Sequence, residues 1–136
     1  APVRVVYSSL EPPTGVTDCP PGMVTGLGRQ DLVLAHADLV ICGGGHGLLA
    51  KALSAQVPVV VVPGGGDQWE LASRVRRAGA GAVVRPVTRD GVAEAVATVL
   101  SDRSYAAAAA GLAGTLRQTV DPVRLVHRVV EEAACE

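Results

Sequence analysis

Short runs of Val, Ile and Leu alternate with longer amphipathic stretches along this chain of 136 residues. Parallel strands that are buried on both faces by crossover helices have this pattern, because both faces of such a strand are apolar. The predicted strands occupy residues 3–7, 39–42, 57–62 and 82–84, with a possible very short strand at residues 23–24. We therefore expect an α/β fold, in which helices cover both faces of a parallel sheet.

The stretches between the predicted strands have helical periodicity. In residues 68–78 the spacing directs Leu71, Ala72 and Val75 inward and the arginines outward. The predicted helices occupy residues 30–35, 48–54, 68–78, 90–100, 104–119 and 122–134. The last of these carries a wide apolar surface that would favour a homodimer if it were exposed.

Length, charge and cysteine content limit the number of domains, the kinds of partner and the cellular compartment that we expect. A length of 136 residues suits one domain, residues 1–136, and a net charge of -1 gives no reason to expect a nucleic acid partner. The three cysteines, Cys19, Cys42 and Cys135, match neither a disulfide framework nor metal-ligand spacing, so we expect a cytoplasmic protein. The scarcity of lysine beside abundant Ala and Arg suggests a bacterial source.

A glycine-rich loop follows the predicted strand at residues 39–42. It reads Gly-Gly-Gly-His-Gly over residues 43–47 and leads directly into a predicted helix. The first amides of a helix have no partners within the helix, and glycine allows a phosphate to approach them closely. An anion site is therefore the favoured interpretation, although the glycines could also serve only as a tight turn.

Two other phosphate-binding motifs also contain glycine-rich loops. Gly45, Gly47 and Ala50 match the spacing of the dinucleotide fingerprint, which keeps half of an NAD-dependent oxidoreductase as an alternative. That fingerprint normally ends with an acidic residue at the tip of the next strand, where this chain has Pro63 and three glycines. A P-loop is excluded, because no Gly-Lys-Ser/Thr follows the glycines.

Three segments taken together resemble the donor-site signature of GT-B glycosyltransferases. They are residues 37–47 (ADLVICGGGHG), 52–58 (ALSAQVP) and 63–68 (PGGGDQ), and the similarity extends over about residues 36–84. The similarity is to bacterial natural-product glycosyltransferases and their UDP-glycosyltransferase relatives. The resemblance implies that the chain is the Rossmann-like C-terminal, donor-binding domain of such an enzyme.

The resemblance also implies roles for particular residues. The donor would be a UDP- or dTDP-sugar, bound as a substrate with no cofactor and no metal ion, and its hexosyl group would pass to the hydroxyl of a small-molecule or lipid acceptor. The implied sugar-binding residues are Asp67 and Gln68. The implied diphosphate-binding residues are Gly44, Gly45, His46 and Gly47.

The chain departs from the family pattern at three positions. Gly43, Leu48 and Lys51 stand where the family usually has a histidine, a Thr or Ser, and often a glutamate that holds the ribose. Losing the hydroxyl would cost about 1 kcal/mol and losing the carboxylate about 1.5 to 3 kcal/mol of binding. These departures keep a noncatalytic nucleotide-binding or regulatory module as an alternative function. Lys51 could pair with a phosphate or be an ordinary exposed lysine.

Several other side chains have structural interpretations as well. Asp67 and Glu70 have the spacing of a capping box, in which Asp67 would accept from the helix amides and Glu70 would reach back. One carboxylate could both cap the helix and bind a sugar. Trp69 could stack on a ligand, but packing is the usual role. His36 and His127 lie in apolar patterns and are expected to be structural.

The catalytic residues cannot be assigned in this chain. In GT-B enzymes the acceptor site and the base lie on an N-terminal domain, which 136 residues cannot also hold. We therefore expect a missing N-terminal domain or partner subunit, and no glycosyl transfer by this chain alone. Inverting transfer with base assistance is implied by the resemblance only.

Overall fold

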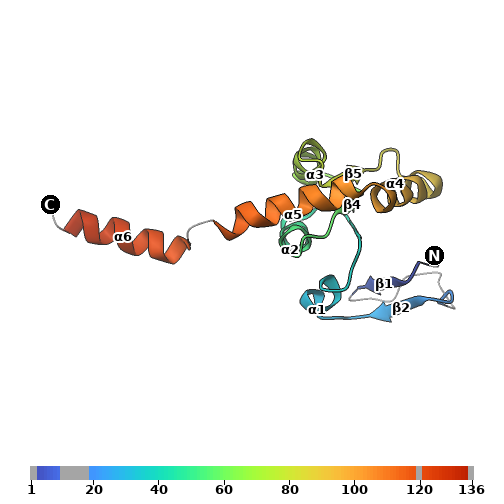
Figure 1. Ribbon diagram of the computed structural model, residues 1–136, viewed down its shortest axis with the longest axis horizontal. Helices are drawn as coiled ribbons and strands as arrows, with labels where there is room; N and C mark the ends of the chain where they lie inside the picture. Colours follow the sequence, from blue (N-terminus) through green and yellow to red (C-terminus); the bar gives the residue numbers. More distant parts are fainter. Residues whose placement is uncertain (1–2, 10–18, 119–120, 135–136) are drawn as a thin grey trace.

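The computed structural model describes residues 3–9, 19–118 and 121–134 (Figure 1). Strands and helices follow each other in the predicted order, and each predicted element is present: α6 has the predicted ends, and the others differ from them slightly. The possible strand at residues 23–24 is confirmed, and Thr119 and Cys135 lie outside the described residues. The elements are β1 (Val5–Ser8), β2 (Met23–Gly26), α1 (Gln30–Leu34), β3 (Val40–Cys42), α2 (His46–Ser54), β4 (Val59–Val61), α3 (Gln68–Arg77), β5 (Gly81–Val83), α4 (Arg89–Ser101), α5 (Arg103–Arg117) and α6 (Pro122–Ala134).

The strands form two parallel sheets. One contains β1 and β2, and the other has the order β3-β4-β5 with β4 in the centre. In the second sheet Val40 pairs with Val59 and Val59 pairs with Gly81. The carboxyl ends of β3 and β4 therefore lie next to each other, together with the loops that follow them.

Helices cover both faces of the three-stranded sheet, as predicted. Val59 and Val61 belong to one buried cluster with residues of α2 and α3, whereas Val60 belongs to a second cluster with Val99 of α4. All three valines of β4 are fully buried. This alternation follows from the pleat, which sends successive side chains of a strand to opposite faces.

The β1-β2 sheet differs from the expectation that strands are buried on both faces. Val5, Val6 and Val24 are 46%, 54% and 66% exposed. Figure 1 shows this sheet lying to one side of β4 and β5, away from α3 and α4. The valines of β1 and β2 remain exposed because the helices that bury the core pack on the other sheet.

Helix α6 projects away from the rest of the protein beyond the end of α5 (Figure 1). Its Val123, Val126 and Val130 are each more than 60% exposed, so the predicted apolar surface is present and uncovered in this structure. Within the described ranges, no helix has both the length and the apolarity that a membrane crossing requires.

The start of α4 provides a stability prediction. Thr88 has extended backbone angles, and its hydroxyl accepts a hydrogen bond of 3.0 Å from the amide of Gly91. We expect Thr88→Ala to lower the free energy of unfolding by about 1 kcal/mol, because the amide loses its cap. Urea denaturation measures this loss. Thr88→Ser keeps the hydroxyl and serves as the control, so an equal loss in both variants would contradict the prediction.

Candidate functional site

Two glycine-containing loops meet at the carboxyl edge of the three-stranded sheet. The first joins β3 to α2, and the second joins β4 to α3. In open parallel α/β sheets, ligands bind outside this edge of the strands. The loops bring together two residues that the sequence predicts to bind different parts of one ligand, because Nδ1 of His46 lies 3.3 Å from Oδ2 of Asp67.

The glycines of the first loop divide into two kinds. Gly44 is buried with φ of 89°, and a Cβ there would lie 2.7 Å from Cγ1 of Val61, so this position requires glycine for the turn itself. Gly45 and Gly47 are exposed, and a Cβ on either would meet nothing within 4 Å. The tight-turn interpretation therefore explains Gly44, whereas Gly45 and Gly47 leave open space above the start of α2.

The first amides of α2 are available to an anion. Gly45 precedes the helix and has no side chain to cap it, and the described part of the chain supplies no other side-chain cap there. Uncapped amides at a helix N-terminus carry partial positive charge. The loop thus combines donors with open space, the two properties that the sequence predicts for a phosphate site.

Gln68 is fixed by the second loop. It is the first residue of α3 and half-buried, and its Oε1 accepts a hydrogen bond of 2.8 Å from the amide of Gly64. Because an amide N–H can only donate, the oxygen of the side chain must face Gly64. The Nε2 group of Gln68 is therefore left as a donor for a ligand.

The capping-box prediction for Asp67 is wrong. The carboxylate does not cap α3, and Asp67 has φ of -65° and ψ of -18°, which are helical angles rather than the extended angles of a capping residue. Glu70 does not reach back, since Oε1 of Glu70 accepts from Nε of Arg74 at 2.9 Å. The hydrogen bond from Arg74 lowers the pKa of Glu70. Asp67 is thus free of the helical role that competed with ligand binding.

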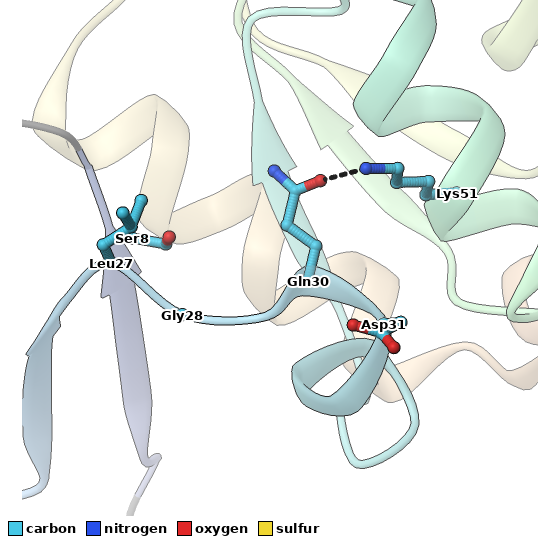
Figure 2. Close-up of a pocket in the computed structure, with 6 residues that line it drawn as sticks. All are labelled: Ser8, Leu27, Gly28, Gln30, Asp31 and Lys51. Atoms are coloured by element: carbon cyan, nitrogen blue, oxygen red, sulfur yellow. Dashed lines mark hydrogen bonds between the residues drawn. The ribbon is translucent and has the colours of Figure 1, made fainter.

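An open pocket of about 540 Å³ lies between the ends of β1 and β2, the start of α1, and α2 (Figure 2). This volume lies within the range of small-molecule sites. Lys51 connects the pocket to the glycine loop, because Lys51 lies on α2, the helix that begins at this loop. Its Nζ donates a hydrogen bond of 2.7 Å to Oε1 of Gln30. The lining residues are Ser8, Leu27, Gly28, Gln30, Asp31 and Lys51.

Sequence reasoning singled out only Lys51 among these lining residues. Ser8 ends β1, whereas Gln30 and Asp31 begin α1, and no spacing in the sequence groups them with Lys51 of α2. Asp31 is ionised under ordinary conditions, because the hydrogen bond from Arg29 lowers the pKa of its carboxyl group. The pocket therefore presents an ammonium group, a carboxylate and an amide to a ligand.

Other candidate residues lie away from the site or pack structurally. The guanidinium carbon of Arg85 lies 4.6 Å from the centre of the Trp69 ring, and Trp69 is half-buried, which favours packing for this residue. The prediction that His36 and His127 are structural is wrong, because both are exposed: His36 follows α1 in a turn, and α6 is uncovered. Burial raises the pKa of the Cys42 thiol, which keeps it protonated.

The fold and the carboxyl-edge loops define a Rossmann-like α/β domain of the kind found in GT-B glycosyltransferases. The chain belongs to the family of C-terminal domains similar to erythromycin biosynthesis protein CIII, whose family model matches residues 16–132. This result confirms the resemblance inferred from residues 36–84 and extends it over most of the chain.

Individual relatives agree with this assignment. The uncharacterised UDP-glucosyltransferase YojK of Bacillus subtilis (strain 168) is 32% identical over 101 residues, which cover 73% of this chain and 25% of YojK. Spinosyn rhamnosyltransferase SpnG superposes with a TM-score of 0.77 at 30% identity, covering 84% of this chain and 32% of SpnG. SsfS6, a glycosyltransferase of Streptomyces sp. SF2575, superposes with a TM-score of 0.74 at 31% identity, covering 93% of this chain and 33% of SsfS6.

Ligand complexes exist for both of these solved structures. SpnG has been solved with thymidine diphosphate and with the spinosyn aglycone, and SsfS6 with thymidine diphosphate. The chain spans about a quarter of the length of YojK and about a third of the length of SpnG and SsfS6.

Proposed function

We propose that this chain binds the nucleotide-sugar donor, a UDP- or dTDP-sugar, of a glycosyltransferase. The observation that carries the proposal is the meeting of the two loops, which sets the uncapped start of α2 beside Asp67 and Gln68. Gly44, Gly45, His46 and Gly47 would surround the diphosphate. Asp67 and Gln68 would bind hydroxyl groups of the sugar.

The pocket of Figure 2 supplies a place for the nucleoside. It adjoins α2 through Lys51, so a nucleoside in the pocket can continue along α2 to a diphosphate at the glycine loop. Lys51 and Gln30 would then contact the ribose or the nearer phosphate. The thymidine diphosphate complexes of SpnG and SsfS6, which are 30% and 31% identical to this chain, support a nucleoside diphosphate as the ligand class.

The activity of the whole protein follows as a proposal from the same relatives. The donor's hexosyl group would pass to a hydroxyl of a small-molecule or lipid acceptor, with the base and the acceptor site on an N-terminal domain or a partner subunit. We expect this chain alone to be inactive. The apolar surface of α6 would contact that partner or a second copy of the chain.

Calorimetric titration of the full-length protein with UDP, dTDP and NAD tests the proposal. We expect saturable binding of UDP or dTDP that is unchanged by EDTA, because backbone amides rather than a metal ion neutralise the phosphates. Preferential binding of NAD would favour the oxidoreductase alternative. Binding of UDP or dTDP without glycosyl transfer would favour the noncatalytic module. Binding of none of the three would refute the proposal.

Gln68 offers a test of how the sugar is bound. Gln68→Glu keeps an oxygen that accepts from Gly64 but replaces the free Nε2 donor with an acceptor. We expect this variant to bind a UDP- or dTDP-sugar about tenfold more weakly, as Gln68→Ala does, while the affinity for UDP or dTDP changes little. Isothermal titration with both ligand types measures the difference. Retained sugar affinity in Gln68→Glu would show that Nε2 donates to no ligand atom.

A further inference from the structure

His46 and Asp67 face each other from the starts of two different helices. His46 is the first residue of α2, Asp67 immediately precedes α3, and Nδ1 and Oδ2 are 3.3 Å apart. The two side chains are 72% and 70% exposed. The pair therefore lies on the open surface of the proposed donor site, where a ligand can cover it.

The two residues proposed to bind the sugar are held in different ways. Gln68 is anchored by the backbone amide of Gly64 at 2.8 Å. Among the described residues, Asp67 has no such anchor, since it does not cap its own helix, and the contact that the structure records for its carboxylate is with His46. His46 is therefore the described residue that is placed to orient the carboxylate of Asp67.

We propose that His46 is a positioning residue for the sugar-binding carboxylate of Asp67, an inference that rests on the proposed donor site. Nδ1 of His46 donates its proton toward Oδ2 of Asp67, and Oδ1 of Asp67 accepts from a sugar hydroxyl. Both the imidazolium ion and the neutral tautomer with its proton on Nδ1 can do this. A separation of 3.3 Å is long for such a bond, and we expect it to shorten when the ligand binds.

His46 would thus contribute to the affinity for the sugar as well as to that for the diphosphate. An exposed ion pair by itself changes an equilibrium by less than about fivefold. A bound sugar excludes water from the pair and strengthens the interaction. We therefore expect the loss of His46 to weaken the sugar contribution to affinity by about tenfold.

The experiment compares UDP with UDP-glucose, and dTDP with dTDP-glucose, by isothermal titration of the full-length protein. In each pair, the dissociation constant of the diphosphate divided by that of the sugar nucleotide gives the sugar contribution to affinity. We expect His46→Ala to reduce this ratio about tenfold and His46→Asn, which keeps an N–H donor, to retain more of it. The double variant with His46→Ala and Asp67→Ala should lose no more of the sugar contribution to affinity than Asp67→Ala alone. His127→Ala, a histidine replacement on the exposed helix α6, is the matched control.

Several results would overturn the inference. One is an equal loss of affinity for diphosphate and sugar nucleotide in His46→Ala, which would restrict His46 to the diphosphate. Others are additive losses in the double variant, equal losses in His46→Ala and His46→Asn, or sugar nucleotides that bind wild-type protein no tighter than their diphosphates. If neither diphosphate binds the wild-type protein, the proposed donor site itself fails. If a diphosphate binds and one of the results above is found, the inference alone fails, so the two failures are distinguishable.

Discussion

Gly47→Val is expected to weaken binding of UDP or dTDP by about 100-fold while leaving the fold intact. Gly47 is the second residue of α2, and a side chain there meets nothing within 4 Å in the free protein. Because Cα–Cβ bonds in a helix tilt toward its N-terminus, a valine side chain would cover the amides that a diphosphate needs. Losing two charge-assisted hydrogen bonds, at about 1.5 kcal/mol or more each, accounts for this factor.

The melting temperature and a control variant on another helix distinguish this loss of binding from a general disturbance of the fold. Valine has a higher helix propensity than glycine, so the melting temperature of Gly47→Val should not fall. Gly111 of α5 is also exposed with nothing within 4 Å of an added Cβ, and Gly111→Val should leave binding unchanged. Titration and thermal scans of both variants provide the comparison. Undiminished binding by a folded Gly47→Val protein would mean that no phosphate reaches the start of α2.

Sequence reasoning predicted the central part of the fold because local pattern and packing agree there. The continuous valines of β4 and the periodic apolar positions of α3 both require burial, and the structure buries Val59, Val60 and Val75. The same reasoning located β1 and β2 correctly but was wrong about their burial. Their apolar residues satisfy the strand pattern equally well, but the pattern carries no information on whether a helix covers a particular sheet.

The candidate site was predictable only where its residues are close in sequence. The glycine loop and the Asp67-Gln68 pair are contiguous motifs, and each could be related to a known family. Their proximity at 3.3 Å depends on the parallel pairing of β3 with β4. The pocket around Gln30 depends on β1, the end of β2, α1 and α2, which no motif connects. The role of Asp67 at the start of α3 was open in the sequence, because it depends on backbone angles that residue identity does not set.

Gly81→Ala is expected to lower the free energy of unfolding by at least about 3 kcal/mol. Gly81 begins β5 beside Val59, the residue with which it pairs on the central strand. A Cβ at this position would overlap the carbonyl oxygen of Val59 and approach Cγ2 of Val59 at 2.8 Å and Cγ1 of Val75 at 2.9 Å. Neither the backbone of β4 nor the closely packed side chains around it can move without disturbing the core.

The matched control is Gly114→Ala on α5, where an added Cβ meets nothing within 4 Å. Alanine in place of an exposed helical glycine should raise the free energy of unfolding by about 0.5 to 1 kcal/mol. The same substitution therefore changes stability in opposite directions at the two positions. Chemical denaturation of both variants measures the difference. A loss below about 1 kcal/mol in Gly81→Ala would mean that β5 can move away from β4 at small cost. The edge that carries both loops would then be less rigid than a preorganised donor site requires.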